Sequence, residues 1–137
     1  MTGDFHYRTQ IAASADEVDR VCCALRPRIA AAGYNYALFK IELILREMLN
    51  NAVIHGCHND ASLFVRLALG ISDGTLEVEV IDDGPGFDWQ KAMDRAYSPT
   101  ATSGRGLCLL KLHSSSIAFN PNGNSVRVCR DLGMGPQ

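Results

Sequence analysis

A stretch of period-two alternation, residues 62 to 82, constrains the fold of this chain more than any other part of its sequence. Apolar side chains occupy every second position on both sides of an Asp73-Gly74 turn signal, a pattern that predicts an antiparallel β-hairpin. The alternating apolar positions are Leu63, Val65, Leu67, Leu69, Leu76, Val78 and Val80. The second strand must turn its apolar residues inward, because the opposite choice would bury Glu77 and Glu79 without partners.

The same alternation places Asp82 on the inward face, at the end of the second strand. An ionised carboxylate that points into a layer of helices requires a specific partner. We therefore single out Asp82 as a candidate functional residue.

A helix is predicted from about Asn35 to about Gly56, and it carries an unusual polar row. Its apolar stripe consists of Ile41, Leu45, Met48 and Ala52. Glu47, Asn51 and His55 recur four apart, roughly a quarter turn from the centre of that stripe. Polar side chains at the edge of a core need hydrogen-bond partners, a metal or a ligand. Such triplets also occur on ordinary surface helices, so this helix alone favours partners within the protein.

The N-terminal part is predicted to form a strand at residues 5 to 12 and a helix that starts with a capping box at Ser14 and Glu17. The apolar face of that helix is Val18, Val21, Cys22, Leu25 and Ile29. Pro27 should kink the helix or end it early, although Gly33 is a natural stop a few residues later.

Glycine-rich segments dominate the second half of the chain. Residues 83 to 87, Asp-Gly-Pro-Gly-Phe, predict a tight turn, and the polar run that ends at residue 103 predicts a mobile loop. Gly104-Arg105-Gly106 leads directly into an apolar helix, whose free N–H groups would suit phosphate. Strands at residues 116 to 119 and 125 to 129 would form a hairpin through Asn122-Gly123.

Bulk properties exclude several classes of function. The chain has 137 residues, of which 47% are hydrophobic, and this predicts one domain spanning residues 1 to 137. A net charge of −2 and 13 scattered basic residues argue against nucleic acid as a partner. The absence of a signal segment or an apolar run of membrane length predicts a cytoplasmic protein that does not bind membranes.

Five cysteines, an odd number, are predicted to be reduced packing residues. His55, Cys57 and His58 lie close together in the sequence but lack a fourth ligand at zinc-site spacing. We therefore favour ordinary structural roles for them over a metal site.

The polar helix row, the strand-end Asp82, the loop and the Gly104-Arg105-Gly106 helix start occur in a fixed order. In this order the chain resembles the histidine-kinase-like ATPase superfamily of DNA gyrase, MutL and sensor histidine kinases. Its length and its Glu-x-x-x-Asn-Ala-x-x-His-Gly motif look like those of the bacterial anti-sigma-factor serine/threonine kinases. The resemblance implies a Bergerat-type ATP-binding fold, a two-layer α/β sandwich whose mixed, mostly antiparallel sheet is covered on one face by helices.

The resemblance also implies a role for each matching residue. Asp82 would accept a hydrogen bond from the adenine amino group, and Asn51 would bind Mg²⁺ between the phosphates of ATP. Asn124 stands where the family usually has a threonine near adenine. The remaining nucleotide-binding positions would be Gly84, Gly86 and Phe87 near the base, and Ser103, Gly104, Arg105, Gly106 and Leu107 around the phosphates. Residues 88 to 103 would form a lid.

The sequence supports a role in phosphoryl transfer more strongly for Glu47 than for His55 or Arg105. Glu47, one turn from Asn51, would act as the general base that accepts the proton of an incoming hydroxyl, as its counterpart does in the family. His55 fits a helix-end hydrogen bond as well as a role in the site. Arg105 fits either a phosphate contact or a solvated surface position.

The resemblance thus predicts an ATP-dependent serine/threonine kinase that phosphorylates a STAS-domain anti-anti-sigma protein and binds a sigma factor in alternation. One alternative is a nucleotide-gated binding module with little transfer activity. Another is a detached histidine-kinase catalytic domain. Family members form homodimers, and apolar residues exposed on the first helix would be a candidate contact face.

Overall fold

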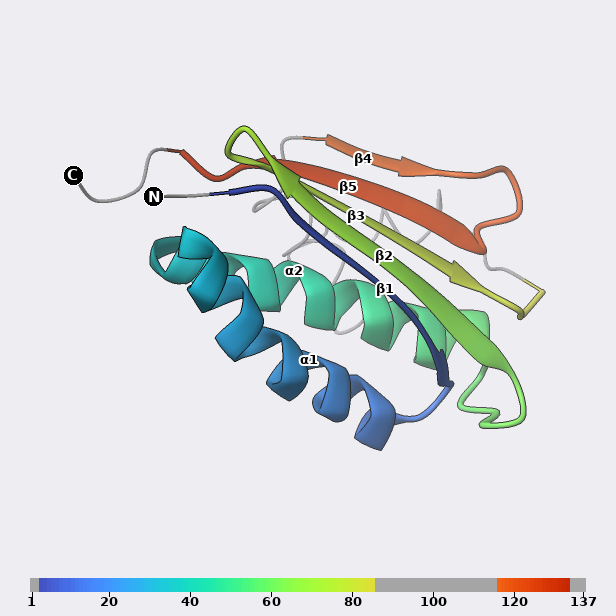
Figure 1. Ribbon diagram of the computed structural model, residues 1–137. Coiled ribbons are helices and arrows are strands. Elements are labelled where there is room, and N and C mark those ends of the chain that lie inside the picture. Colours follow the sequence, from blue (N-terminus) through green and yellow to red (C-terminus); the bar gives the residue numbers. More distant parts are fainter. Residues whose placement is uncertain (1–2, 86–115, 134–137) are drawn as a thin grey trace, which may run out of the picture.

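A five-stranded sheet with two helices on one face forms the protein in the computed structural model, which describes residues 3–85 and 116–133 (Figure 1). The strand order is β1-β2-β3-β5-β4. The strands are β1 (Phe5–Ala12), β2 (Phe64–Ser72), β3 (Thr75–Asp82), β4 (Ser116–Phe119) and β5 (Ser125–Asp131), and the helices are α1 (Ala15–Ile29) and α2 (Leu38–Asn51). The predicted two-layer α/β sandwich, with helices on one face of the sheet, is confirmed.

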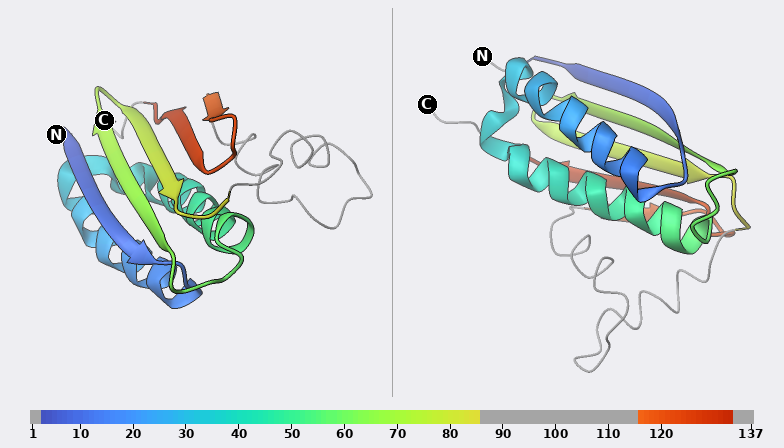
Figure 2. Two further views of the ribbon diagram at one scale, coloured as in Figure 1. Left: turned by 90° about the vertical axis from the view of Figure 1, so that its right-hand side faces the viewer. Right: turned by 90° about the horizontal axis from the view of Figure 1, so that it is seen from below.

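Every strand pairing within the described residues is antiparallel, so the expected mixed character of the sheet does not appear there. Tight turns force this direction on β2–β3 and β4–β5. Between β1 and β2 the chain travels along α1 and back along α2, so β2 starts beside the end of β1, where Ala12 pairs with Phe64. The two helices lie side by side under the sheet (Figure 2).

Both hairpin turns use the residues that their backbone requires. Asp73 and Gly74 have φ angles of 52° and 75°, the positive pair that a two-residue turn of this hand needs. Gly123, in the β4–β5 turn, also has a φ of 75°. The predicted turn positions are confirmed.

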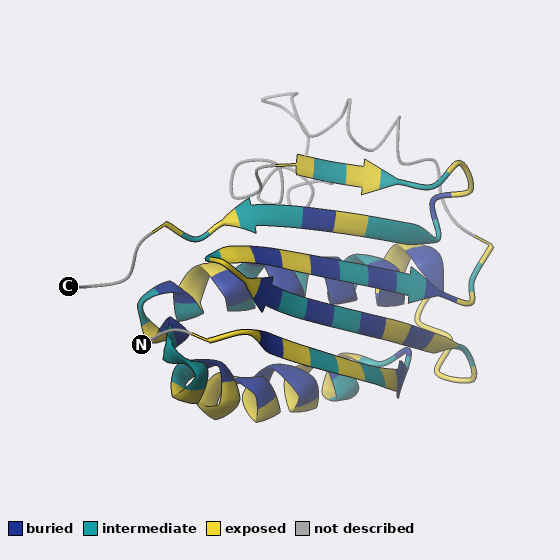
Figure 3. Ribbon diagram, turned by 45° about the horizontal axis from the view of Figure 1, so that its top comes forward, coloured by how far each residue is buried: buried dark blue, intermediate teal, exposed yellow. Residues whose placement is uncertain are grey.

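The core lies between the sheet and the helices. Strand β3 alternates as predicted, with Leu76, Val78 and Val80 at most 1% exposed and Glu77 facing solvent (Figure 3). The five predicted apolar positions of α1 are all buried against the sheet and α2. These five positions therefore form part of the core.

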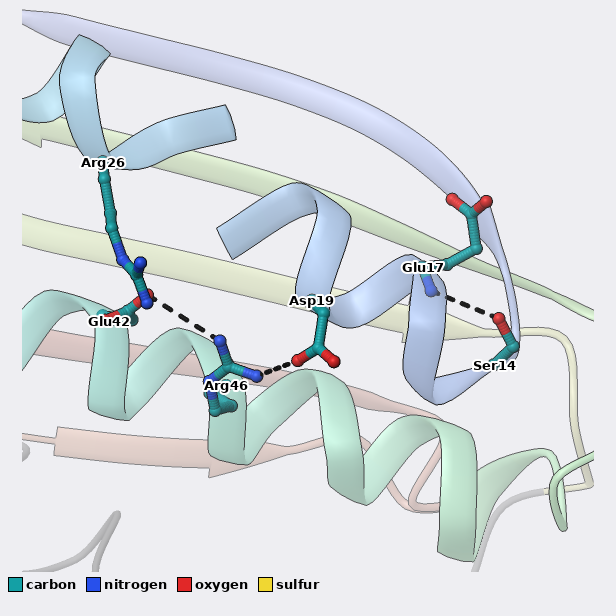
Figure 4. Close-up of polar contacts among 6 residues, drawn as sticks. All are labelled: Ser14, Glu17, Asp19, Arg26, Glu42 and Arg46. Atoms are coloured by element: carbon teal, nitrogen blue, oxygen red, sulfur yellow. Dashed lines mark hydrogen bonds and ion pairs between the residues drawn. The ribbon is translucent and has the colours of Figure 1, made fainter. Parts of the chain in front are cut away.

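Helix α1 begins as predicted but continues past Pro27. The Ser14 hydroxyl oxygen accepts a hydrogen bond from the backbone N–H of Glu17 at 3.3 Å, which caps the helix (Figure 4). The side chain of Glu17 pairs with Arg20 instead of completing the capping box. Pro27 lies in the last turn, where the helix runs on to Ile29, and the chain leaves the helical conformation at Gly33, whose φ is 98°.

Helix α2 is longer than its regular α-helical part. A 3₁₀ turn at Asn35–Ala37 precedes it, and a π-helical turn at Ala52–Gly56 follows it. None of the helices in the described ranges is long and apolar enough to cross a membrane. The cysteines in those ranges, Cys22, Cys23, Cys57 and Cys129, are free thiols.

Candidate functional site

A small cavity lies between the C-terminal half of α2 and the adjoining ends of β3, β4 and β5, together with the β4–β5 turn. It brings together three of the predicted site residues, Asn51, Asp82 and Asn124, from three separate elements. The other lining residues are Met48, Ala52, Val80, Phe119, Gly123, Ser125 and Val126. A larger hollow on the uncovered face of the sheet, lined in part by His6, Arg8 and Arg127, contains none of the predicted residues.

Asp82 points into the molecule, as its parity in β3 predicted, and is only 5% exposed. Its Oδ1 accepts a hydrogen bond of 2.9 Å from the backbone N–H of Gly84. Burial raises the pKa of the Asp82 carboxyl group, and the Asp83 carboxylate adds to that rise, whereas the Gly84 N–H and the charge of His58 oppose it. No cation within the described residues forms a salt bridge with Asp82. The carboxylate is thus a buried acceptor with unused capacity.

Two glycines let the end of the α2 segment approach the Asp82 turn very closely. A Cβ atom at Gly84 would lie 1.8 Å from the Gly56 carbonyl oxygen. A Cβ atom at Gly56 would lie 2.3 Å from Asp82 Oδ2. Gly84 was predicted from its turn motif, whereas Gly56 was interpreted as a helix end and as the last residue of the helix motif, without a role in the site. Its role depends on contact with a strand far along the sequence.

Asn51 lies at the end of α2 and has an unsatisfied amide. Its Nδ2 is buried, and no group within the described residues accepts a hydrogen bond from it. A buried donor without a partner is rare in folded proteins and is usually explained by a water, an ion or a ligand. Asn51 and Asp82 both line the cavity, one from the helix and one from the sheet.

Glu47, one turn before Asn51, is half-buried and does not line the cavity. Burial raises the pKa of its carboxyl group, and no second influence from the described residues contributes. A carboxylate with a raised pKa is a better proton acceptor near neutral pH than an exposed one.

The predicted row of Glu47, Asn51 and His55 does not continue straight to His55. The chain changes from α-helical to π-helical geometry at Ala52, which shifts the angular position of every later residue. His55 is exposed and lies outside the cavity lining. The wider turn closes where Cys57 donates its backbone N–H to the Ala52 carbonyl oxygen at 2.8 Å.

Asn124 lies beside Asp82 and is held within the protein. The backbone N–H of Asp82 donates to the Asn124 carbonyl oxygen at 2.9 Å, and the Asn124 Nδ2 donates to the Asp82 carbonyl oxygen at 3.5 Å. The Asn124 Oδ1 accepts a hydrogen bond from Asn120 Nδ2 at 2.5 Å. These contacts fix the β4–β5 turn against β3.

The remaining predicted site residues lie outside the described residues. They are Gly86, Phe87, Ser103, Gly104, Arg105, Gly106 and Leu107. The phosphate cradle and the lid thus stay predictions from the sequence.

The fold and the cavity define a class of α/β sandwich proteins that present a buried acid on the sheet opposite an amide on the covering helix. The model of the histidine kinase-like ATPase domain matches residues 11–130, and the chain belongs to this family. The family predicted from the sequence motifs is therefore confirmed, and membership of this ATPase family implies ATP binding.

Individual relatives agree with this assignment. An anti-sigma F factor from Oceanobacillus iheyensis is 28% identical over 105 residues, which cover 69% of this chain and 70% of that protein. Among solved structures, the histidine kinase domain of a blue-light activated histidine kinase from Erythrobacter litoralis matches with a TM-score of 0.54 and 22% identity. That match covers 89% of this chain but only 62% of the kinase chain, and it supports the fold alone.

Proposed function

We propose that the chain is an ATP-dependent serine/threonine protein kinase that acts as a partner-switching, anti-sigma-type regulator. One observation carries the nucleotide-binding part of this proposal. Within the described residues, the buried carboxylate of Asp82 has no salt-bridge partner and the buried amide nitrogen of Asn51 has no acceptor, and both side chains line the same cavity. ATP combines an amino group that can donate to the Asp82 carboxylate with metal-bound phosphates whose oxygens can accept from the Asn51 amide.

In this proposal the adenine base lies near Asp82 and Asn124, and the phosphates extend toward Asn51. The described residues contain no cluster of three His, Cys, Asp or Glu side chains that could hold a metal ion. Mg²⁺ would therefore enter with the phosphates and take the Asn51 Oδ1 as its protein ligand, a hard oxygen suited to a hard cation. Bound in this way, it would neutralise phosphate charge during transfer.

Glu47 would accept the proton of the attacking serine or threonine hydroxyl. The raised pKa of its carboxyl group supports this role, since a stronger base removes a proton more readily. His55 and the undescribed Arg105 are secondary candidates for contacts with the phosphates or the lid.

The partners in this proposal follow from the resemblance to anti-sigma factors. The phosphate acceptor would be a STAS-domain anti-anti-sigma-like protein, and a sigma factor would be the alternative partner. We place this regulator in the cytoplasm, as a single domain of residues 1 to 137 that works as a homodimer.

A second candidate, a nucleotide-gated binding module with little transfer activity, is favoured by one observation. The lining of the cavity includes the base-contacting and metal-binding candidates but not Glu47. In such a module, bound nucleotide would change partner affinity without a chemical step.

The test mixes the purified protein with ATP, Mg²⁺ and a STAS-domain protein from the same cell, and locates phosphate by mass spectrometry. Phosphoserine or phosphothreonine on the STAS protein supports the kinase. Tight ATP binding in calorimetry without any transfer supports the binding module. Phosphohistidine on a separate acceptor would show that the chain is a detached histidine-kinase domain, and the absence of adenine nucleotide binding would refute all three.

A further inference from the structure

Gly56 lacks the usual reasons for being a glycine. The positive-φ glycines of the described residues are Gly33, Gly74, Gly123 and Gly133, so the backbone of Gly56 does not demand a missing side chain. Gly56 also lies in a helical turn, where glycine is less favourable than alanine by about 0.5–1 kcal/mol. The small size of glycine, rather than its backbone conformation, must therefore explain why glycine occupies position 56.

The space at Gly56 is filled by the carboxyl group of Asp82. A Cβ atom at position 56 would lie 2.3 Å from Asp82 Oδ2, 2.5 Å from Cγ and 2.8 Å from Oδ1. All three atoms of the carboxyl group thus rest against bare helix backbone. Real side chains do not approach this closely, so any side chain at position 56 must displace the carboxylate.

The surroundings leave the carboxylate little room to move. The Gly56 carbonyl oxygen faces Gly84, whose backbone N–H holds Asp82 Oδ1 at 2.9 Å. The neighbouring Cys57 is buried, and burial together with the Asp82 carboxylate raises the pKa of its thiol, while N–H groups of Asp83 and Gly84 act against that rise. The end of the α2 segment and the turn after β3 therefore pack tightly against each other and against Asp82.

We propose that Gly56 is a positioning residue that determines specificity for the purine base. Because Gly56 has no side chain, the Asp82 carboxylate can lie against the helix backbone with one side free to accept a hydrogen bond from the amino group of adenine. This inference rests on the proposed function of Asp82. The Gly84 N–H occupies only part of the acceptor capacity of a carboxylate, which has about four lone-pair directions. A methyl group at position 56 would rotate the carboxylate away from this seat and weaken the selection for a 6-amino purine.

The experiment compares two magnesium-bound nucleotides, ADP and purine riboside 5′-diphosphate, which differ only in the 6-amino group. Calorimetry measures both affinities for the wild-type chain, Gly56→Ala, Asp82→Ala and the double variant. For the wild type we expect a preference for ADP of about 10- to 100-fold, the usual effect of one hydrogen bond to a buried charged group. We expect this preference to fall to about twofold in Gly56→Ala and to be absent in both variants that lack the carboxylate.

The double variant separates an action through Asp82 from a general one. Asp82→Ala removes the three atoms that lie nearest to a methyl group at position 56, so the double variant should bind ADP as Asp82→Ala does. If Gly56→Ala alone fails to fold, thermal unfolding should show that adding Asp82→Ala restores folding. Gly70→Ala is the matched control, since its methyl group would meet mainly the movable ring of His6 on the other face of the sheet. It should keep the full preference.

Three results would overturn the inference. Gly56→Ala could retain the wild-type preference for ADP, it could weaken both nucleotides equally, or the double variant could remain unfolded when Asp82→Ala folds. If wild type and Asp82→Ala show the same lack of preference, or the same strong preference, the adenine role of Asp82 fails as well. The pattern across the four proteins therefore distinguishes failure of this inference from failure of the proposed function.

Discussion

Helix α2 carries polar residues four apart on two of its sides. On one side these residues have partners within the protein, and on the other side the described residues supply none. On the outer side, Glu42 and Arg46 lie four apart and join a network with α1 (Figure 4). Arg26 Nε donates to Glu42 Oε1 at 2.7 Å, and Arg46 pairs with Asp19. On the inner side, Glu47 and Asn51 also lie four apart, yet the described residues supply no partner for the Glu47 carboxylate or for the Asn51 Nδ2.

We interpret this difference as a division of roles within one helix: polar residues on the outer side contribute to stability, and those on the inner side contribute to function. Exposed ion pairs cost little to form and contribute little, because water solvates each partner when the pair breaks. Half-buried polar groups without partners weaken the folded state unless a ligand satisfies them. Substitutions on the outer side should therefore change stability slightly, and those on the inner side should change ligand binding or chemistry strongly.

The largest effect should come from Glu47→Gln. Removing a general base lowers transfer by about 10²- to 10⁴-fold, while the amide keeps the shape of the side chain and so preserves nucleotide binding. Phosphate transfer to the STAS protein and calorimetry with ADP measure the two properties separately. Glu42→Gln, the same change on the outer side of the same helix, is the control and should leave transfer intact. Equal losses in both variants would refute the division between the two sides.

Asn51→Ala should have the next largest effect. Loss of the proposed magnesium ligand should weaken binding of Mg²⁺-bound ADP by about 10- to 100-fold. Stability without nucleotide should not fall, because the substitution removes a buried donor that has no partner in the described residues. Thermal unfolding with and without nucleotide measures both quantities, and Asn50→Ala next to it is the control. A large loss of stability without nucleotide would mean that Asn51 has a structural partner.

Asp82→Asn tests the sheet side of the cavity through pH. Burial raises the pKa of Asp82 in the folded state, so folding stability falls as pH rises from the unfolded value, about 3.9, through the raised folded value. Above that window the wild type keeps this penalty, and the amide does not. The variant should be more stable than the wild type by about 1 kcal/mol at neutral pH, with the difference vanishing below about pH 4. Urea unfolding between pH 4 and pH 8 measures this, and a difference independent of pH would contradict it.

The sequence predicted those features that depend on residues close together in the chain, namely which face of a strand a residue occupies and where the hairpin turns lie. Alternation alone placed Asp82 inward, and Asp73-Gly74 and Asn122-Gly123 marked both hairpin turns. The π-helical turn that ends at Gly56 was not predictable in this way, because it accompanies a contact with Gly84, just beyond the end of β3 and distant in the sequence. That turn displaced His55 from the expected row. Pro27 was misjudged because a proline near the end of a helix removes only one late hydrogen bond.

The smallest effect should come from Arg46→Met, which keeps most of the apolar stem and removes only the charge. The side chains of its two partners, Asp19 and Glu42, are 64% and 23% exposed, so the network resembles surface pairs worth about 0.2–1 kcal/mol each. The free energy of unfolding should fall by about that amount at low salt, and the loss should shrink near 1 M salt, where screening acts over about 3 Å. Nucleotide affinity should not change. If calorimetry shows that Arg46→Met weakens ADP binding as Asn51→Ala does, the outer network belongs to the site, and the two sides of α2 do not have separate roles.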